Sequence, residues 1–352
     1  MKMANFLMPK SIPASQVNEV TTVGPDITFE RGVALDRGPI GDIAAGPQYI
    51  VVTNFGDNSV SLLNAGTLAV EATIAVDGEP FATVVTDDRA YVSTSSESFD
   101  AVSVIDTNTR TVIATYSLAF GVTALAISPD GKRIYAGRTG RDHVDVAVID
   151  TTAERVGTID VATGAGISID GLDVDPSGKR LYVATTDARG GQLVVVNTET
   201  ARVERTVWVG SPIRDLAFAD GTAYVLTSDR TRGGVVSLID LTTSRITDTI
   251  DLGGAPTQMT LSPDKSRAYI VDYDQVMVLC TLSLEVVNTV TVTARPSCVA
   301  VSPEGDRLHV ADYAGGVAAF AVTSTLPMLY LQFMATEPIA VAGRRELEPA
   351  SV

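Results

Sequence analysis

The chain contains few side chains of the kinds that carry out catalysis. Its 352 residues include two histidines, His143 and His309, and two cysteines, Cys280 and Cys298. No CxxC pair is present for zinc or redox chemistry, and no GxSxG sequence presents a serine nucleophile. Copper sites need more histidine ligands than this chain contains. We therefore predict no catalytic residue, no metal site and no cofactor.

Each histidine has a functional and a structural interpretation. His143 lies in the sequence TGRDHVDV beside Asp142 and near Asp145, and a histidine flanked by carboxylates is suited to base catalysis or metal binding. A loop residue that leads into a strand is the simpler interpretation. His309 stands where six related segments have tyrosine, which favours a buried ring in place of another ring.

Two sets of carboxylates follow the apolar runs of the sequence. The first set lies near the starts of such runs and comprises Asp42, Asp170, Asp173 and Asp215. If these side chains converged, their carboxylate oxygens would be suitable ligands for Mg²⁺ or Ca²⁺. Loop solvation and capping is the simpler interpretation of this set. The second set recurs at the ends of later runs, where a side-chain oxygen accepts backbone N–H groups of the next turn; it comprises Asp106, Asp150, Asp240 and, in the same place, Asn197.

The charge balance limits the partners. The chain has 26 Lys and Arg against 42 Asp and Glu, a formal net charge of −16. Nucleic-acid binders take most of their affinity from clustered basic residues, so we predict no nucleic-acid partner. The first residues lack the continuous apolar run of a signal peptide, and no window reaches the roughly 18 apolar residues of a membrane span. We expect a cytoplasmic protein without a direct membrane span.

A repeat organises most of the chain. One aromatic ring recurs every 40–47 residues inside similar apolar runs, at Tyr49, Tyr91, Tyr135, Tyr182, Tyr224, Tyr269 and His309. Short sequences such as SPDGKR (128–133) and SPEGDR (302–307) precede most of these rings. We interpret them as tight turns, because Pro, Asp and Gly in this order favour such turns. Further alternating runs such as VSVIDT (102–107) follow. Each repeat therefore predicts four short strands.

Seven such repeats predict an all-β fold, a seven-bladed β-propeller with four-stranded antiparallel blades. One blade alone cannot bury both of its faces, whereas blades packed in a ring can. We assign the blades to residues 39–322, an N-terminal segment to 1–38 and a C-terminal extension to 323–352.

The last blade lacks an obvious fourth strand. The segment Val17–Val23 resembles the outer strand of blade six, since VNEVT (17–21) matches VNTVT (287–291). An N-terminal strand at about 16–24 would complete blade seven, close the ring and leave no open edge. The alternative is that MLYLQF (328–333) supplies this strand; we favour the N-terminal one.

The motifs SPDGKRIYAG, DPSGKRLYVAT and SPDKSRAYIVD resemble the YVTN-type repeats of bacterial seven-bladed propellers, over roughly residues 40–322. The chain is similar in length to the actinobacterial cytoplasmic propeller that accompanies the inner-membrane trehalose monomycolate transporter. The resemblance is specific for the fold. It implies a protein partner at the cytoplasmic side of the inner membrane, such as a lipid transporter complex, and a protein that is a monomer by itself.

One face of such a ring would gather arginines. In a propeller, the loops that join second to third strands and those that join consecutive blades share one face, which we name the loop face. These loops contain Arg138, Arg141, His143, Arg189, Arg230, Arg232, Arg214 and Arg295. Because guanidinium groups pair with carboxylates and other anions, this set is a candidate partner-binding surface. Solvated loop charge, balanced by neighbouring aspartates, is the alternative interpretation.

The C-terminal extension has no counterpart in the repeats. It contains an apolar cluster that includes Leu329, Tyr330 and Phe333, which is costly to leave in water. We expect it to pack on its own ring; binding a partner is the alternative.

Two classes of function follow. The first is a non-enzymatic scaffold, which the resemblance makes an accessory factor that stabilises a cell-envelope lipid transport complex. The second is a lactonase-like hydrolase with a divalent metal in the central channel. A lactonase would place His143 or His309 with several acids in one polar funnel, whereas a scaffold would line the channel with small residues. We favour the scaffold.

Overall fold

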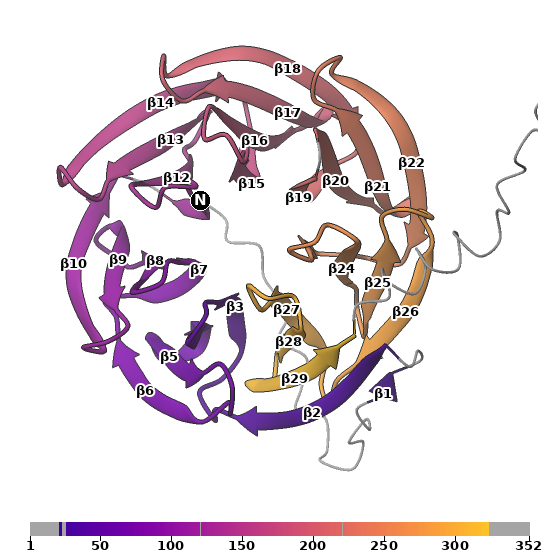
Figure 1. Ribbon diagram of the computed structural model, residues 1–352. Coiled ribbons are helices and arrows are strands. Elements are labelled where there is room, and N and C mark those ends of the chain that lie inside the picture. Colours follow the sequence, from indigo (N-terminus) through magenta and orange to yellow (C-terminus); the bar gives the residue numbers. More distant parts are fainter. Residues whose placement is uncertain (1–20, 23–25, 120, 220, 324–352) are drawn as a thin grey trace, which may run out of the picture.

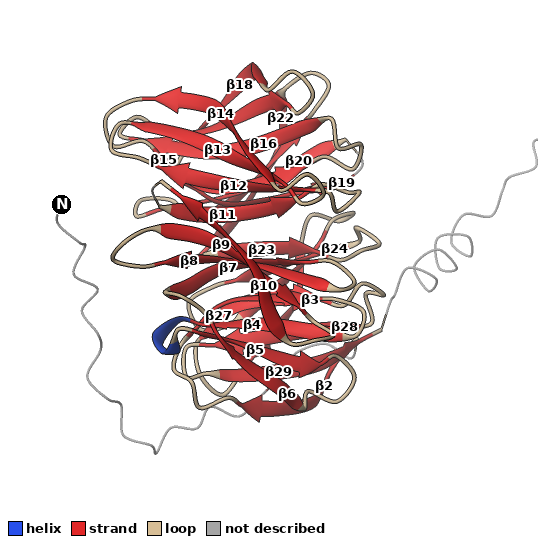
Figure 2. Ribbon diagram, turned by 90° about the vertical axis from the view of Figure 1, so that its left-hand side faces the viewer, coloured by secondary structure: helices blue, strands red, loops and turns tan. Residues whose placement is uncertain are grey.

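A computed structural model describes residues 21–22, 26–119, 121–219 and 221–323. Within these ranges the chain forms a ring of seven sheets with almost no helix (Figures 1 and 2), the exception being the short 3-10 helix η1 (Phe55–Asp57). Neighbouring strands within each sheet are antiparallel. The all-β, seven-bladed propeller predicted from the repeats is confirmed.

The strands form four concentric layers, each of which is described in order from blade one to blade seven. The innermost strands are β3 (Ile40–Ala45), β7 (Glu79–Val85), β11 (Val122–Ile127), β15 (Ser168–Val174), β19 (Ile213–Ala219), β23 (Gln258–Leu261) and β27 (Pro296–Val301). The second strands are β4 (Tyr49–Asn54), β8 (Arg89–Ser95), β12 (Arg133–Thr139), β16 (Arg180–Asp187), β20 (Thr222–Asp229), β24 (Arg267–Val271) and β28 (Arg307–Asp312).

The third strands are β5 (Ser59–Asn64), β9 (Asp100–Asp106), β13 (His143–Asp150), β17 (Gly190–Asn197), β21 (Gly233–Asp240), β25 (Val276–Cys280) and β29 (Gly316–Val322). The outer strands are β6 (Val70–Ala75), β10 (Thr111–Leu118), β14 (Arg155–Thr163), β18 (Arg202–Gly210), β22 (Arg245–Gly253), β26 (Val286–Thr291) and, in blade seven, β2 (Ile27–Ala34).

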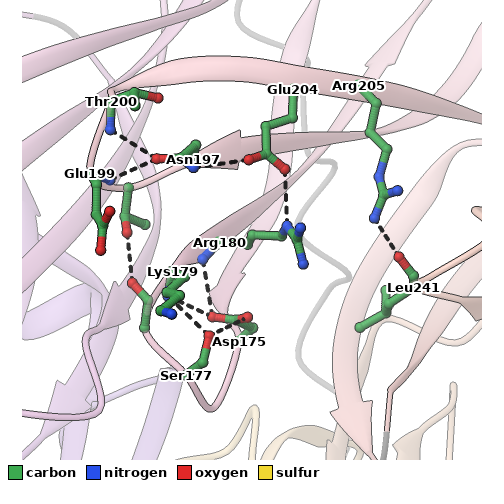
Figure 3. A network of polar contacts seen from close by, with 12 residues as sticks. Asp175, Ser177, Lys179, Arg180, Asn197, Glu199, Thr200, Glu204, Arg205 and Leu241 are labelled. Atoms are coloured by element: carbon green, nitrogen blue, oxygen red, sulfur yellow. Dashed lines mark hydrogen bonds and ion pairs between the residues drawn. The ribbon is translucent and has the colours of Figure 1, made fainter.

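The recurring turns follow from side-chain oxygens that bind backbone N–H groups. Asp106 Oδ1 accepts hydrogen bonds from the amides of Asn108 and Thr109, and Asn197 does the same for the two residues Glu199 and Thr200 (Figure 3). These bonds, led by the one from Thr109, lower the pKa of Asp106. The structural interpretation of the strand-end aspartates is therefore confirmed, and the same geometry recurs at Asp150 and Asp240.

The repeat aromatics lie in the second strands and form part of the core between blades. Tyr91, Tyr135, Tyr182 and Tyr269 are among the largest fully buried side chains, and His309 takes the same place in β28 with 1% of its surface exposed. The interpretation of His309 as a ring that replaces a ring is consistent with this burial. Across a blade junction, Arg205 donates to the carbonyl of Leu241, which links blades four and five (Figure 3).

The ring closes through an N-terminal strand in the last blade, as predicted, but not through the predicted residues. Strand β2 (Ile27–Ala34) pairs along its length with β29, so that the indigo and yellow ends of the described chain lie side by side in Figure 1. Of the predicted segment 16–24, the structure describes only β1 (Thr21–Thr22), which extends blade six by pairing with β26. The placement at 16–24 was wrong; the alternative strand at 328–333 lies outside the described residues.

The physical reason lies in the side chains of residues 27–34. Ile27 is fully buried against the core formed by blades six and seven, together with Phe320 and Leu308. The likeness of VNEVT to VNTVT pointed to blade six, and β1 does lie beside that strand as a fifth strand. Sequence similarity identified a neighbour of blade six rather than the strand that completes blade seven.

Candidate functional site: the channel mouth on the loop face

All seven innermost strands begin at the loop face and surround a cavity of about 410 Å³, which we name the channel mouth. Each blade contributes two consecutive residues at the equivalent position, in or directly before its innermost strand. The pairs are Gly41–Asp42, Phe81–Ala82, Thr123–Ala124, Asp170–Gly171, Arg214–Asp215, Thr257–Gln258 and Ser297–Cys298. Tyr313, Leu125 and Leu172 add to the lining.

A β-bulge explains why neighbouring residues line one cavity. In a regular strand they would point to opposite faces, but a bulge sets two residues against one on the partner strand. The register of β3 against β4 shifts between Ile40 and Ile43, and equivalent shifts occur in blades two, three, four, five and seven. Hydroxyl groups of the second strands satisfy the amides of the bulges, as when Asp42 N–H donates to Thr53 Oγ1.

Two of the predicted aspartates bridge consecutive blades at this mouth. Asp42 accepts from the amide of Ile43 with one oxygen and from the amide of Thr83, in blade two, with the other, at 2.9 Å each. Asp215 repeats this arrangement with Leu216 and with Met259 of blade six, at 2.8 and 2.9 Å.

Gln258 occupies the same position in blade six and continues the pattern. Its Oε1 accepts from the amide of Val299 in blade seven at 2.8 Å, and its Nε2 reaches across the cavity to Asp42 Oδ1 at 3.4 Å. The capping interpretation of Asp42 and Asp215 is therefore supported by their contacts. Their caps hold neighbouring blades together, which repeat counting alone did not reveal.

Burial raises the pKa of these carboxyls towards neutrality. Loss of hydration is the largest cause, and it raises the pKa of Asp42 to about 6 and that of Asp215 to about 7, although backbone amides act in the opposite direction. The charges of Asp42 and Asp173 raise the pKa of Asp215 further. Asp173 lies on β15 two residues after Gly171, the second residue of the blade-four pair, and burial raises its pKa to about 6. The mouth therefore holds carboxyl groups that change charge near neutral pH.

Asp170 and Arg214 complete the charged groups of the lining. Burial raises the pKa of Asp170, and the positive charge of Arg214 acts against that rise. Among the residues that the structure describes, no group of three or more His, Cys, Asp or Glu side chains is arranged to hold a metal ion. Neither His143 nor His309 lines the channel mouth. The polar funnel that a lactonase would need is not formed by these histidines.

The structure corrects one member of the predicted arginine surface. Arg138 lies within strand β12 and has 7% of its surface exposed. Its Nε donates to Asp145 at 2.6 Å, and its Nη2 donates to Thr158 at 3.2 Å. Strands β12 and β13 extend further towards the loop face than the sequence indicated, so Arg138 belongs to a buried ion pair rather than to a loop surface.

The other predicted residues lie on the loop face, and several are already paired. Arg189 contacts Asp187 at 2.7 Å, Arg232 contacts Asp251 at 2.9 Å, and His143 lies 3.7 Å from Asp142. Arg141 and Arg230 are exposed, and Arg214 borders the channel mouth. The arginines are therefore spread around the rim instead of forming one cluster, and local carboxylates balance part of their charge.

Sequence reasoning missed two exposed tyrosines on this face. Tyr273 and Tyr313 follow the second strands of blades six and seven and are 58% and 51% exposed. Arg295, from the loop between these blades, lies with its guanidinium 3.7 Å from the Tyr273 ring centre and 5.9 Å from that of Tyr313. We name these three residues the tyrosine sector. The dipeptide Asp-Tyr, which follows β24 and spans the end of β28, was the available signal.

The tyrosine sector lies in a low part of the loop face. Strand β24 ends two residues after Tyr269 and β28 ends three residues after His309, whereas the second strands of blades one to five end four or five residues after their aromatic position. At about 3.3 Å a residue, the neighbouring hairpins stand several ångströms higher. Tyr313 also lines the channel mouth, so sector and cavity are continuous.

Comparison with known proteins places the chain in a family. A seven-bladed beta-propeller protein of Mycolicibacterium smegmatis is 56% identical over 316 residues, covering 89% of this chain and 86% of the relative. The seven-bladed beta-propeller protein Rv1057 of Mycobacterium tuberculosis is 38% identical over 297 residues, covering 73% and 76%. The chain belongs to this family of seven-bladed β-propeller proteins.

Wider comparisons give the fold without a function. A chain of hydrazine synthase from Kuenenia stuttgartiensis has a TM-score of 0.73 at 21% identity, covering 82% of this propeller and 97% of that chain. At this identity the likeness shows the shared fold alone. No family model matches the sequence. Leu329, Tyr330 and Phe333, in the predicted C-terminal extension, lie outside the described residues.

The part of this propeller that the structure describes contains no helix with the length and apolar character of a membrane span.

Proposed function

We propose that this propeller is a non-enzymatic scaffold that binds a partner protein through its loop face. The observation that carries the proposal is the tyrosine sector. Two half-exposed tyrosines with an arginine stacked against them form a surface of the composition that dominates binding energy at protein interfaces. Arg230, exposed on the higher hairpin of the adjoining blade five, adds a polar residue beside it.

Our finer proposal concerns the partner. The YVTN-type resemblance supports a role as an accessory factor that stabilises a trehalose monomycolate transport complex at the cytoplasmic side of the inner membrane. In this role the loop face docks on the transporter or on one of its subunits, and the propeller itself stays cytoplasmic. No observation favours the alternative, a lactonase-like hydrolase, over this proposal.

The test is affinity capture of the tagged protein from its native cells after mild solubilisation of the membranes. We expect the transporter complex to be recovered with the parent protein and lost with the double variant Tyr273→Ala/Tyr313→Ala. The matched control is Leu282→Ala, because Leu282 is 71% exposed in the turn between β25 and β26 on the opposite face. Recovery that is equal in all three samples would contradict the loop face as the binding surface.

A second arm tests the stabilising role. Removal of the protein from the cells should lower the amount of assembled transporter complex, and re-expression of the parent should restore it. The tyrosine variant should fail to restore the complex although it accumulates to the parental level. Unchanged complex levels in cells without the protein would overturn the accessory role.

A further inference from the structure

The loop face offers a partner two adjoining surfaces of different chemistry. The tyrosine sector is exposed and rich in aromatic and cationic groups, whereas the channel mouth beside it is a recessed cavity with three carboxyl groups and one guanidinium in its lining. Tyr313 belongs to both, because its ring lines the cavity and lies near Arg295. A segment bound to the sector therefore has the cavity within reach of its side chains.

The charges of the cavity select the kind of side chain. Asp42, Asp170 and Asp215 share the lining with Arg214, so the lining carries more potential negative than positive charge. One oxygen of Asp170, Oδ2, is buried without a hydrogen-bond partner among the described residues. The other oxygen of Asp170, Oδ1, accepts from Ser168 Oγ at 3.1 Å, so this carboxyl contributes its charge to the lining.

The volume and the mixed lining of the cavity favour a long and flexible side chain. A volume of about 410 Å³ holds more than one side chain, and Phe81 and Leu125 add apolar surface to a lining that is otherwise largely polar. Phe81 packs on Phe55 at 5.1 Å between ring centres, which fixes the apolar wall in place. The apolar stem of a lysine or arginine suits such a wall while its charged end reaches the carboxylates.

We propose that the channel mouth receives a lysine or arginine side chain from a partner protein segment that lies across the tyrosine sector. The carboxylates of Asp42, Asp170 and Asp215 bind the cationic group, and Tyr273 and Tyr313 contact the residues that flank it. This inference rests on the proposed function for the source of the segment, and it adds the chemistry by which the segment is recognised.

The protonation of these carboxyls is consistent with this role. Crowded, poorly hydrated carboxyls hold their protons more tightly, as the raised pKa values of Asp42 and Asp215 indicate. A cation between them stabilises their ionised forms, so binding adds a charge-assisted hydrogen bond to the electrostatic attraction. The other groups that face these carboxyls are Asp173, Arg214 and the thiol of Cys298.

The test uses the full-length protein and a blocked pentapeptide with one central arginine among glycines. Binding is followed by the amide resonances of Thr83 and Met259, which donate to Asp42 and Asp215. We expect saturable shifts with this peptide, and an affinity weaker by about tenfold or more when citrulline, which lacks the charge, replaces arginine. No saturable shift at about 10 mM arginine peptide would overturn the proposal.

Variants locate the binding group. Asp42→Asn/Asp215→Asn should lower the affinity for the arginine peptide by about tenfold or more, and the single variants should each lower it less. Asp248→Asn removes an exposed carboxyl on the outer strand β22 and should leave the affinity unchanged. Equal affinities of the double variant and the parent would overturn the proposal, and a cooperative unfolding transition in each variant would show that the variants are folded.

Affinity capture separates this inference from the proposed function. Loss of the partner with the tyrosine variant together with full retention by Asp42→Asn/Asp215→Asn would overturn the inference and leave the scaffold role standing. Loss of the partner with the tyrosine variant and with the aspartate variant supports both the scaffold role and the inference. Saturable binding of the arginine peptide in a protein that captures no partner would overturn the scaffold role and retain the cation-binding site.

Discussion

Asp26 and Arg267 join the N-terminal segment to blade six through a largely buried ion pair. The carboxylate of Asp26, next to the ring-closing strand β2, lies 2.8 Å from the guanidinium of Arg267 at the start of β24. Asn288 in the outer strand of blade six donates to the same carboxylate at 2.9 Å. The N-terminal segment is therefore fixed to blade six by charge and to blade seven by the pairing of β2 with β29.

Loss of this ion pair should weaken ring closure. Arg267→Met leaves the carboxylate of Asp26 poorly hydrated without its cation, so we expect the free energy of unfolding to fall by about 3 kcal/mol. Urea unfolding at neutral pH measures this change. Arg307→Met is the control, because Arg307 pairs with Glu30 at a more exposed site and should cost less than about 1 kcal/mol. Equal losses in the two variants would contradict the special role of Asp26.

Charge reversal at Arg138 should damage the fold rather than an interface. Arg138 and Asp145 form a buried pair, so Arg138→Glu places two carboxylates against each other and should cost about 3–5 kcal/mol. Arg141→Glu and Arg230→Glu, at exposed positions, should change stability by less than about 0.5 kcal/mol. Thermal unfolding of the three variants distinguishes these outcomes. A stable Arg138→Glu variant would show that the pair is dispensable.

Asp215 should make the propeller less stable as the pH rises. Its pKa is about 7 in the folded protein against an ordinary value of 3.8, so the folded state holds the proton more tightly than the unfolded state. Stability is therefore lost as pH rises from the unfolded to the folded pKa. Asp215→Asn removes this loss. The free energy of unfolding of the variant relative to that of the parent should therefore increase by about 1–2 kcal/mol over that pH range, a figure reduced for screening by solvent.

The measurement is urea unfolding of the parent and Asp215→Asn at pH values near 4 and near 8. Asparagine offers one acceptor oxygen where aspartate offers two, so one backbone amide loses its bond at either pH. The cost of this lost bond cancels when the stability difference between variant and parent at pH 4 is compared with the same difference at pH 8. A difference between parent and variant that does not change with pH would show that Asp215 titrates normally.

His309 should have the opposite dependence on pH. Burial lowers its pKa to about 4, from 6.5 when unfolded, and the charge of Arg307 acts in the same direction. Because the unfolded state binds the proton first, stability falls as the pH decreases from 6.5 towards 4. His309→Phe keeps a ring in the core and removes the titration. Relative to the parent, the free energy of unfolding of this variant should therefore be about 1–2 kcal/mol larger at pH 5 than at pH 7. Parallel unfolding curves at both pH values would contradict a neutral buried histidine.

The sequence by itself determined the architecture and the local turns. Proline, aspartate and glycine at fixed places set the tight turns, and alternating Val, Ile and Thr set the strands, so the repeat predicted four strands a blade and seven blades. The caps at Asp106 and Asn197 were predicted for the same reason, because a side chain that binds amides two and three residues ahead needs only local geometry.

Only the tertiary structure decided which residues meet at the channel mouth. Asp42 and Gln258 are 216 residues apart, and their contact requires closure of the whole ring. The bulges that turn two successive residues into the cavity depend on strand register, which the period-two pattern leaves open within one residue. Burial of Arg138 and exposure of Tyr273 likewise follow from where each hairpin ends. Strand type is a local property of this chain, whereas register, hairpin height and ring closure depend on contacts between distant blades.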